Sequence, residues 1–258
     1  MTPIDRVLAA LPGPVASADP AEPVPHPLYR ALLDGVDARP VLRVVIGRAW
    51  ILVRTAAGAG MAFAPRWPTG PAPARSERLD GVMLRDLALL ALRRHEAAAA
   101  IGVAAINAHY NRTDLAGSDD DGLAGAAPAG GGPTVVIGRF PGLDEKLPGA
   151  LVIERHPGPH DLPEAAADTL LPTARRVIIT ASSLTNHSLP RLLALARRAE
   201  VSLIGPGTPL APCLFGFGLA TLAGFVLERP DEAAEAIAAG AGYGKLKGFG
   251  RRLTLRRG

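Results

Sequence analysis

The segment "VIITASSLTNHSLPRLLAL", Val177 to Leu195, contains the transition that decides the fold. It begins with three β-branched residues, which favour a buried strand, and it ends with the apolar spacing of an amphipathic helix. Seven hydrogen-bonding side chains lie between the two: Thr180, Ser182, Ser183, Thr185, Asn186, His187 and Ser188. A buried strand followed by a helix predicts one unit of a parallel sheet that helices cover.

The same alternation of short apolar strands and helices recurs on both sides of this unit. We predict further strands at 134–138, 150–154, 201–205 and 222–227, and further helices at 163–171 and 230–240. Pro163 suits the first turn of one helix, and Gly240 suits the end of the other. Strands that are apolar on both faces are typical of a parallel sheet between two helical layers. The second half is therefore predicted to be a Rossmann-like α/β domain.

The first half has a different order of elements. Strands are predicted at 39–47, 49–55 and 60–64, and helices follow at 83–95 and 96–111. Strands followed by helices indicate an α+β unit. The segment Thr113–Pro133 is rich in Gly, Ala and Asp and has no apolar period, which indicates a flexible linker or a long loop. We therefore expect an α+β domain over residues 1–112, a linker over 113–133 and the α/β domain over 134–258.

The composition limits the partners that the chain could have. Of its 258 residues, 48% are hydrophobic, which is ample for a core, and the net charge is only +4. Aromatic residues make up 4%, so no basic patch with interleaved aromatics is apparent and no nucleic-acid partner is expected. The basic tail from Lys245 onward is interpreted as a solvated end or a charge-protected strand edge. The single cysteine, Cys213, excludes an internal disulfide and a Cys-rich metal site.

We expect a cytoplasmic protein that does not insert into a membrane. Met1–Leu11 contains Asp5 and Arg6 and lacks the apolar run of a signal peptide. Val201–Leu227 carries no charge, but prolines and glycines interrupt it. We interpret that stretch as strand, loop, short helix and strand inside a core. The sequence leaves a homodimer open.

Polar residues follow every predicted strand of the second half. They are "GRFPG" at 138–142, Glu154 with "RHPGPHD", "TASSLTN" at 180–186 and "GPGTPLAPC" at 205–213. Ligands bind at the carboxyl ends of parallel strands, so these segments predict one polar crevice. Asn186 or Ser188 could also cap the helix that follows. No G-x-G-x-x-G, G-x-x-x-x-G-K-[ST] or G-x-S-x-G pattern is present.

As a set, these motifs resemble a family described as "Putative heavy-metal chelation". The resemblance rests on "GRAWILV", "GAGMA", "INAHYN", "VVIGRFPGL", "LVIERHPGPHDLP", "VIITASSLTNHSL" and "LIGPGTPLAPCLFGFGLATLAG". It implies a small domain similar to the N-terminal domain of enolase, followed by a Rossmann-like domain, with a ligand cleft between them. The residues that it places at the cleft are Asn107, Gly138, Phe140, Pro141, Glu154, Thr180, Leu184, Asn186, Gly205, Pro206, Thr208 and Pro209. Gly207 and Arg155 depart from the family pattern.

These candidates favour a protein that binds a small polar or anionic ligand. Ser182 joins the ligand-binding set, and Glu154 is the candidate general base if the site is catalytic. Glu154, His156 and His160 are the candidate metal ligands, because imidazole and carboxylate suit several transition metals. The cofactor is otherwise unknown. One alternative is a transferase or lyase that uses Glu154, and another is a nucleotide- or adenosyl-cofactor-binding protein in which Glu154 meets a ribose hydroxyl.

Overall fold

The structure is a computed structural model, and it describes residues 26–65, 79–123 and 132–258. The N-terminal segment Met1–Leu11 and residues 124–131 of the predicted linker lie outside the described residues. Two sheets are present, as predicted, and the polypeptide is an α/β protein. No helix within the described ranges is both long and apolar enough to cross a bilayer.

The first half forms a three-stranded antiparallel sheet. Its strands β1 (Val41–Ile46), β2 (Trp50–Thr55) and β3 (Ala59–Phe63) lie in the order β1-β2-β3. The Ala-rich helix α4 (Glu96–Tyr110) packs on β2 and β3. Gly60 and Gly102 have no side chain, which allows a close approach: a Cβ on Gly60 would lie 2.2 Å from the Ala108 nitrogen. The helix predicted at 83–95 divides into α3 (Leu84–Ala88) and the 3-10 turn η2 (Leu89–Leu92), beside Gly102.

The second half forms a seven-stranded sheet in the order β10-β9-β8-β7-β4-β5-β6. All neighbouring strands are parallel except β10, which is antiparallel to β9. The strands are β4 (Thr134–Ile137), β5 (Leu151–Glu154), β6 (Leu162–Pro163), β7 (Arg176–Thr180), β8 (Glu200–Ile204), β9 (Leu219–Leu227) and β10 (Gly250–Arg256). Residues 250–256 of the basic tail thus form an edge strand, which is one of the two interpretations that the sequence allowed.

Short helices connect these strands. They are α5 (Leu143–Lys146), η3 (Glu164–Ala166), α6 (Ala167–Leu170), η4 (Leu171–Thr173), α7 (Ser182–Thr185), α8 (Leu189–Leu195), η5 (Pro212–Phe217), α9 (Pro230–Ala238), α10 (Tyr243–Leu246) and η6 (Lys247–Phe249). The uncharged stretch Val201–Leu227 forms β8, a loop, η5 and β9, which confirms its interpretation as core rather than membrane span.

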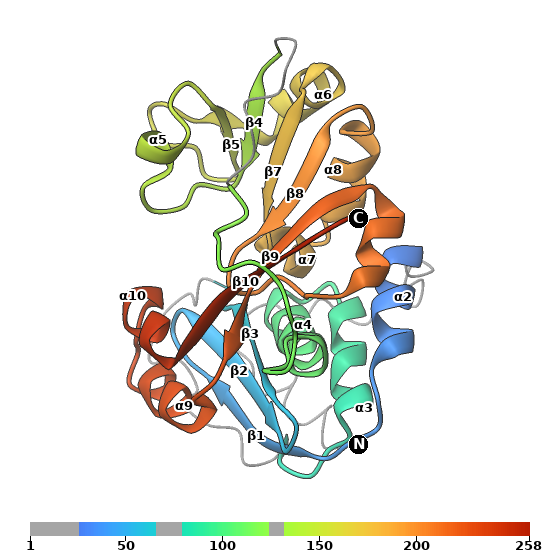
Figure 1. Cartoon of the computed structure of the whole chain (residues 1–258), viewed down its shortest axis with the longest axis vertical. Helices are drawn as coiled ribbons and strands as arrows, with labels where there is room; N and C mark the ends of the chain where they lie inside the picture. Colours follow the sequence, from blue (N-terminus) through green and yellow to red (C-terminus); the bar gives the residue numbers. More distant parts are fainter. Residues whose placement is uncertain (1–25, 66–78, 124–131) are drawn as a thin grey trace.

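The two halves interlock rather than simply adjoin. Figure 1 shows α9 and α10, from the end of the chain, beside the first sheet. There Ile237 and Leu246 share an apolar cluster with Val45 and Leu52. In the opposite direction, α2 (Pro27–Gly35) packs on η5 of the second half. Because each half covers apolar surface of the other, their relative position is fixed by core packing.

The described part of the predicted linker, residues 113–123, is tied to the edge strand β10. Ser118 and Thr254 pair as an antiparallel bridge. Asp120 accepts from the Gly122 amide and forms an ion pair with Arg256. These contacts cover part of the sheet edge, which would otherwise expose unpaired backbone groups.

Candidate functional site

The carboxyl ends of the parallel strands meet the first half of the molecule at a change in strand order. From β4 the chain proceeds outward to β5 and β6, and it then returns to β7 on the other side of β4. Loops after β4 and β7 therefore leave the sheet in opposite directions, which is the arrangement that forms a binding crevice in open α/β sheets. The sequence predicted the loops of this crevice, and the structure brings them to one edge.

Gly138 directly follows β4 and Thr180 ends β7. Gly138 has a φ of +90°, and a Cβ there would lie 2.2 Å from the Thr180 hydroxyl oxygen. Glycine therefore provides both the backbone conformation and the space for the threonine side chain. The Thr180 hydroxyl lies 3.0 Å from the Ser182 hydroxyl, so these two predicted ligand-binding groups are adjacent.

Glu154 joins the loops that follow β4 and β5. Its Oε1 accepts from the Arg139 amide, and its Oε2 accepts from the Arg155 amide at 3.1 Å. The carboxylate therefore fixes backbone at the crevice. Each oxygen retains a second lone pair for another partner, since a carboxylate can accept about four hydrogen bonds in all.

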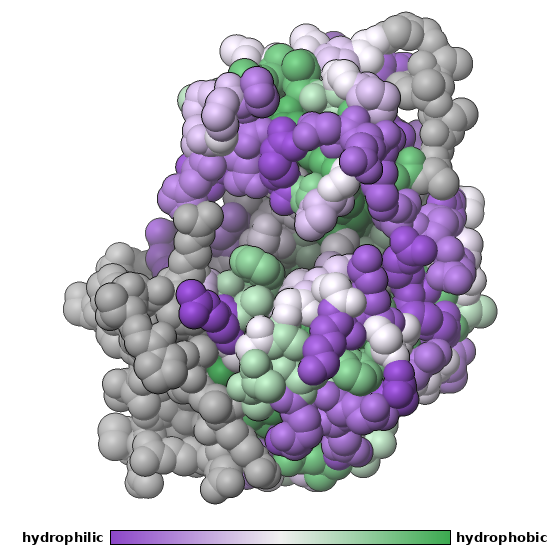
Figure 2. Space-filling view, turned by 90° about the vertical axis from the view of Figure 1, so that its left-hand side faces the viewer, coloured by the Kyte–Doolittle hydropathy of each residue, from purple (hydrophilic) through white to green (hydrophobic). Residues whose placement is uncertain are grey.

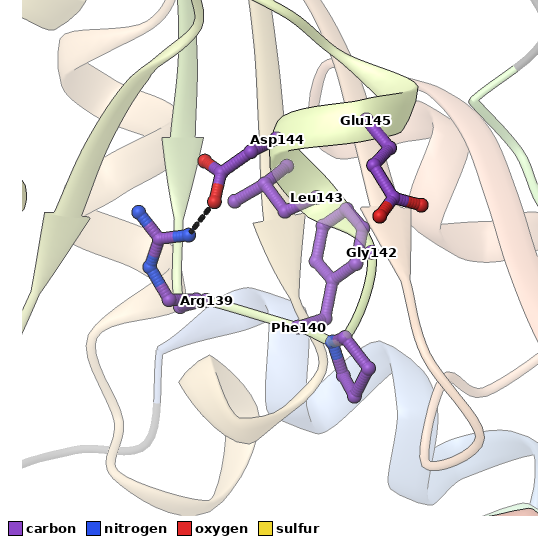
Figure 3. Close-up of a pocket in the computed structure, with 7 residues that line it drawn as sticks. Arg139, Phe140, Gly142, Leu143, Asp144 and Glu145 are labelled. Atoms are coloured by element: carbon purple, nitrogen blue, oxygen red, sulfur yellow. Dashed lines mark hydrogen bonds and ion pairs between the residues drawn. The ribbon is translucent and has the colours of Figure 1, made fainter.

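The loop after β4 contains a charged network. The Arg139 guanidinium donates to Asp161 at 2.7 Å and to Asp144 at 2.8 Å. Its hydrogen bonds hold the pKa of the Asp161 carboxyl below the usual range. An open pocket of about 480 Å³ lies against this loop, and Figure 3 shows the residues that line it: Arg139, Phe140, Pro141, Gly142, Leu143, Asp144 and Glu145. Phe140 and Pro141, both predicted site residues, are among them.

Of the predicted metal ligands, Glu154 ends β5, and His156 and His160 lie in the loop that follows. Glu154 is half-buried, whereas His156 and His160 are exposed. Within the described ranges, no group of three or more His, Cys, Asp or Glu side chains is arranged to hold a metal ion.

The loop after β7 is held by contacts with the first half. Tyr29 of α2 donates to the Leu184 carbonyl at 2.7 Å. The His187 ring stacks on Tyr29, and its Nε2 lies 3.1 Å from the Arg93 carbonyl oxygen. Burial lowers the pKa of His187, which favours the neutral ring. Asn186 accepts from the Ser188 amide and hydroxyl in the turn ahead of α8, but neither Asn186 nor Ser188 caps α8 with its side chain, so the predicted capping role is wrong.

The loop after β8 is held by two asparagines, Asn107 in the last turn of α4 and Asn111 directly after its end. Asn107 donates to the Met61 carbonyl at 2.7 Å and to the Gly207 carbonyl at 2.8 Å. Asn111, one turn later, donates to the Thr208 and Phe225 carbonyls and accepts from the Leu210 amide. Gly205 and Pro206 of this loop are half-buried, and Thr208 and Pro209 are buried. The first half therefore supplies one wall of the site, and Figure 2 shows a recess in the surface between the two halves.

Some residues of the site, Asn111 and Tyr29 among them, were not singled out from the sequence. Asn111 could have been, because it lies four positions after Asn107 in the helix predicted at 96–111, and that spacing places two side chains on one face of a helix. The roles of Arg139, Tyr29 and His187 depend on contacts between distant segments. No local pattern indicates those contacts.

Comparisons with known proteins confirm the family resemblance. Two family models described as "Putative heavy-metal chelation" match residues 29–110 and 127–256. A crystal structure of a protein with unknown function from Desulfitobacterium hafniense is 31% identical, covers 90% of this chain and 98% of its own, and has a TM-score of 0.81.

A second crystal structure, of a protein with unknown function from Pyrococcus horikoshii, is 19% identical. It covers 89% of this chain and 98% of its own, with a TM-score of 0.72, and supports the fold alone. None of the curated proteins that were compared matches the chain.

Proposed function

The chain belongs to the family described as "Putative heavy-metal chelation", and we propose that it binds a small polar metal chelate in the recess between its two halves. The observation that carries this proposal is the change in strand order between β4 and β7. At that position the loops after β4, β5, β7 and β8 converge, and the first half of the chain covers them. Such a position is where open α/β sheets bind ligands.

The donor groups favour a chelate over a bare ion. Heavy-metal ions bound by protein alone require several nitrogen, sulfur or carboxylate ligands in a compact arrangement. Glu154 already accepts from two amides, and His156 and His160 extend from an exposed loop. A metal that arrives within an organic chelator brings most of its own ligands. The protein then needs to recognise the chelator's polar atoms and add at most one or two donors.

Glu154 is the residue of this site that we expect to matter most for binding. Its carboxylate fixes the amides of Arg139 and Arg155, and it retains lone pairs for a further partner in the crevice. In Glu154→Gln, one of the two oxygens becomes an NH₂ group that cannot accept from an amide. The substitution therefore loosens a loop and removes a negative charge beside the bound metal.

The test is the metal and organic content of protein purified without chelators or affinity metal. Elemental analysis and native mass spectrometry should show about one metal and one organic molecule per chain in the wild type. We expect Glu154→Gln to retain about one tenth or less of the wild-type metal and organic content. A tenfold decrease corresponds to the loss of one charge-assisted contact. Glu200→Gln, at the amino end of β8, is the matched control and should retain wild-type content. Equal content in all three proteins, or no metal and no organic mass in the wild type, would contradict the proposal.

A further inference from the structure

Three buried oxygen atoms at the junction of the two halves have no hydrogen-bond partner among the described residues. They are Oδ1 of Asn107, Oγ of Ser183 and Oγ1 of Thr208. The exposed fractions of these residues are 0%, 2% and 0%. Buried polar groups are almost always paired, so three such atoms in one region indicate that the region has a partner still to bind.

The three residues come from elements that contact one another. The Asn107 amide nitrogen lies 2.8 Å from the carbonyl oxygen of Gly207, which directly precedes Thr208. A Cβ on Gly207 would lie 3.8 Å from the Cβ of Ala181, which precedes α7. Ser183 is in α7, and α7 packs on both α4 and β3. The residues that carry the unpaired atoms therefore lie on neighbouring elements, where α7 and the loop after β8 meet α4.

The orientation of the Asn107 amide is fixed by its own contacts. Its NH₂ group donates both hydrogens to carbonyl oxygens, those of Met61 and Gly207. A flipped amide would place its oxygen against these two acceptors, so the observed orientation is the stable one. Oδ1 is consequently an acceptor for which no described residue supplies a donor.

The chemistry of this region suits an uncharged donor. An amide oxygen and two hydroxyls are neutral, and no Asp or Glu is among the buried residues of the described ranges. A bare metal ion there would have no compensating charge, and burying an uncompensated charge is costly. An N–H or O–H group of an organic molecule would satisfy Oδ1. The two hydroxyls can either donate or accept, and they can complete its pairing.

We propose that the organic part of the chelate presents an uncharged N–H or O–H group to Asn107, with Ser183 and Thr208 completing its hydrogen bonds. This inference rests on the proposed function, since it names the part of that ligand that enters the junction. The metal remains on the outer side, near Glu154. The three oxygens are shielded from solvent, so binding involves a local movement of the loop 205–209, which contains Gly205 and Gly207.

Thr208→Val and Ser183→Ala test the proposal, because the first replaces and the second removes a hydroxyl that no described residue pairs. On protein stripped of ligand by dialysis, with native mass spectrometry as the check, both variants should melt at or above the wild-type Tm. A buried polar group without a partner destabilises the folded state. Thr254→Val is the matched control: the Thr254 hydroxyl is equally buried but donates to the Asp120 carbonyl at 3.0 Å, so its loss should lower the Tm.

The second readout is the fraction of each protein that carries the organic mass before dialysis. We expect this fraction to be about tenfold lower in Thr208→Val and Ser183→Ala than in the wild type, and unchanged in Thr254→Val. A lower Tm in Thr208→Val and Ser183→Ala would show that the hydroxyls serve the fold, and undiminished complex would show that the ligand does not touch them. Either result overturns the inference while the chelate proposal stands. A wild type without any organic mass overturns both.

Discussion

Replacing Asn111 with alanine is expected to lower the free energy of unfolding by about 3 kcal/mol or more, because it leaves three buried backbone groups unpaired. Those groups are the carbonyls of Thr208 and Phe225 and the amide of Leu210. Asn111 is 1% exposed, so water cannot readily replace its contacts. The loss should also release the loop after β8 from α4. Urea unfolding, followed by circular dichroism, measures the change.

Asn186→Ala is the control for that measurement. Asn186 is half-buried and its side chain accepts only from Ser188 in the turn before α8, so its loss should cost about 1 kcal/mol. The hydrogen bonds indicate that Asn107 and Asn111 hold the two halves together. If Asn111→Ala lowers the free energy of unfolding no more than Asn186→Ala does, that role is contradicted.

Replacing Gly60 with alanine should be similarly damaging, at about 3 kcal/mol or more, because the added methyl has no space. It would lie 2.2 Å from the Ala108 nitrogen and 2.4 Å from the Ala104 carbonyl oxygen. Both are backbone atoms of α4 and cannot rotate away. Strand β3 and helix α4 would have to separate, which also displaces the Met61 carbonyl from Asn107. Thermal unfolding of the purified variant measures the effect.

Gly244→Ala provides the comparison. Gly244 lies in α10 without a positive φ, and no atom lies within 4 Å of the place that its added methyl group would occupy. Alanine there should therefore be neutral or stabilise the fold by about 0.5–1 kcal/mol. Equal stability of Gly60→Ala and Gly244→Ala would mean that β3 and α4 are not in the close contact described.

The fold could be predicted from the sequence wherever the signal is local. The strand-to-helix transition at Val177–Leu195 and the apolar strands around it predicted the parallel sheet, and the structure has it. The sequence could not predict that α2 packs on the second half of the chain or that α9 packs on the sheet of the first half. The pattern of α9 shows an apolar face but not which sheet it covers, and that depends on a contact between residues such as Ile237 and Val45.

The candidate site could be predicted by position but not in its internal contacts. The polar residues that follow the strands lie at the crevice because parallel strands share one carboxyl edge. The sequence could not show that Glu154 accepts from two amides, or that Arg139 connects Asp144 and Asp161. Those pairings depend on loop conformation. The distinction between paired side chains, as in Asn186 and Ser188, and unpaired ones, as in Thr208, has the same origin.

Anomalous diffraction from crystals of the protein, purified without chelators or affinity metal, tests a chelate site at the carboxyl edge most directly. We predict one metal peak in the recess between the loops 138–142 and 205–209, on the side of Glu154, with organic density extending toward Asn107. The peak should be absent from crystals of Glu154→Gln. A peak at the amino edge of the sheet, a peak bound only by exposed histidines, or no peak at all would contradict a chelate-binding site at the junction.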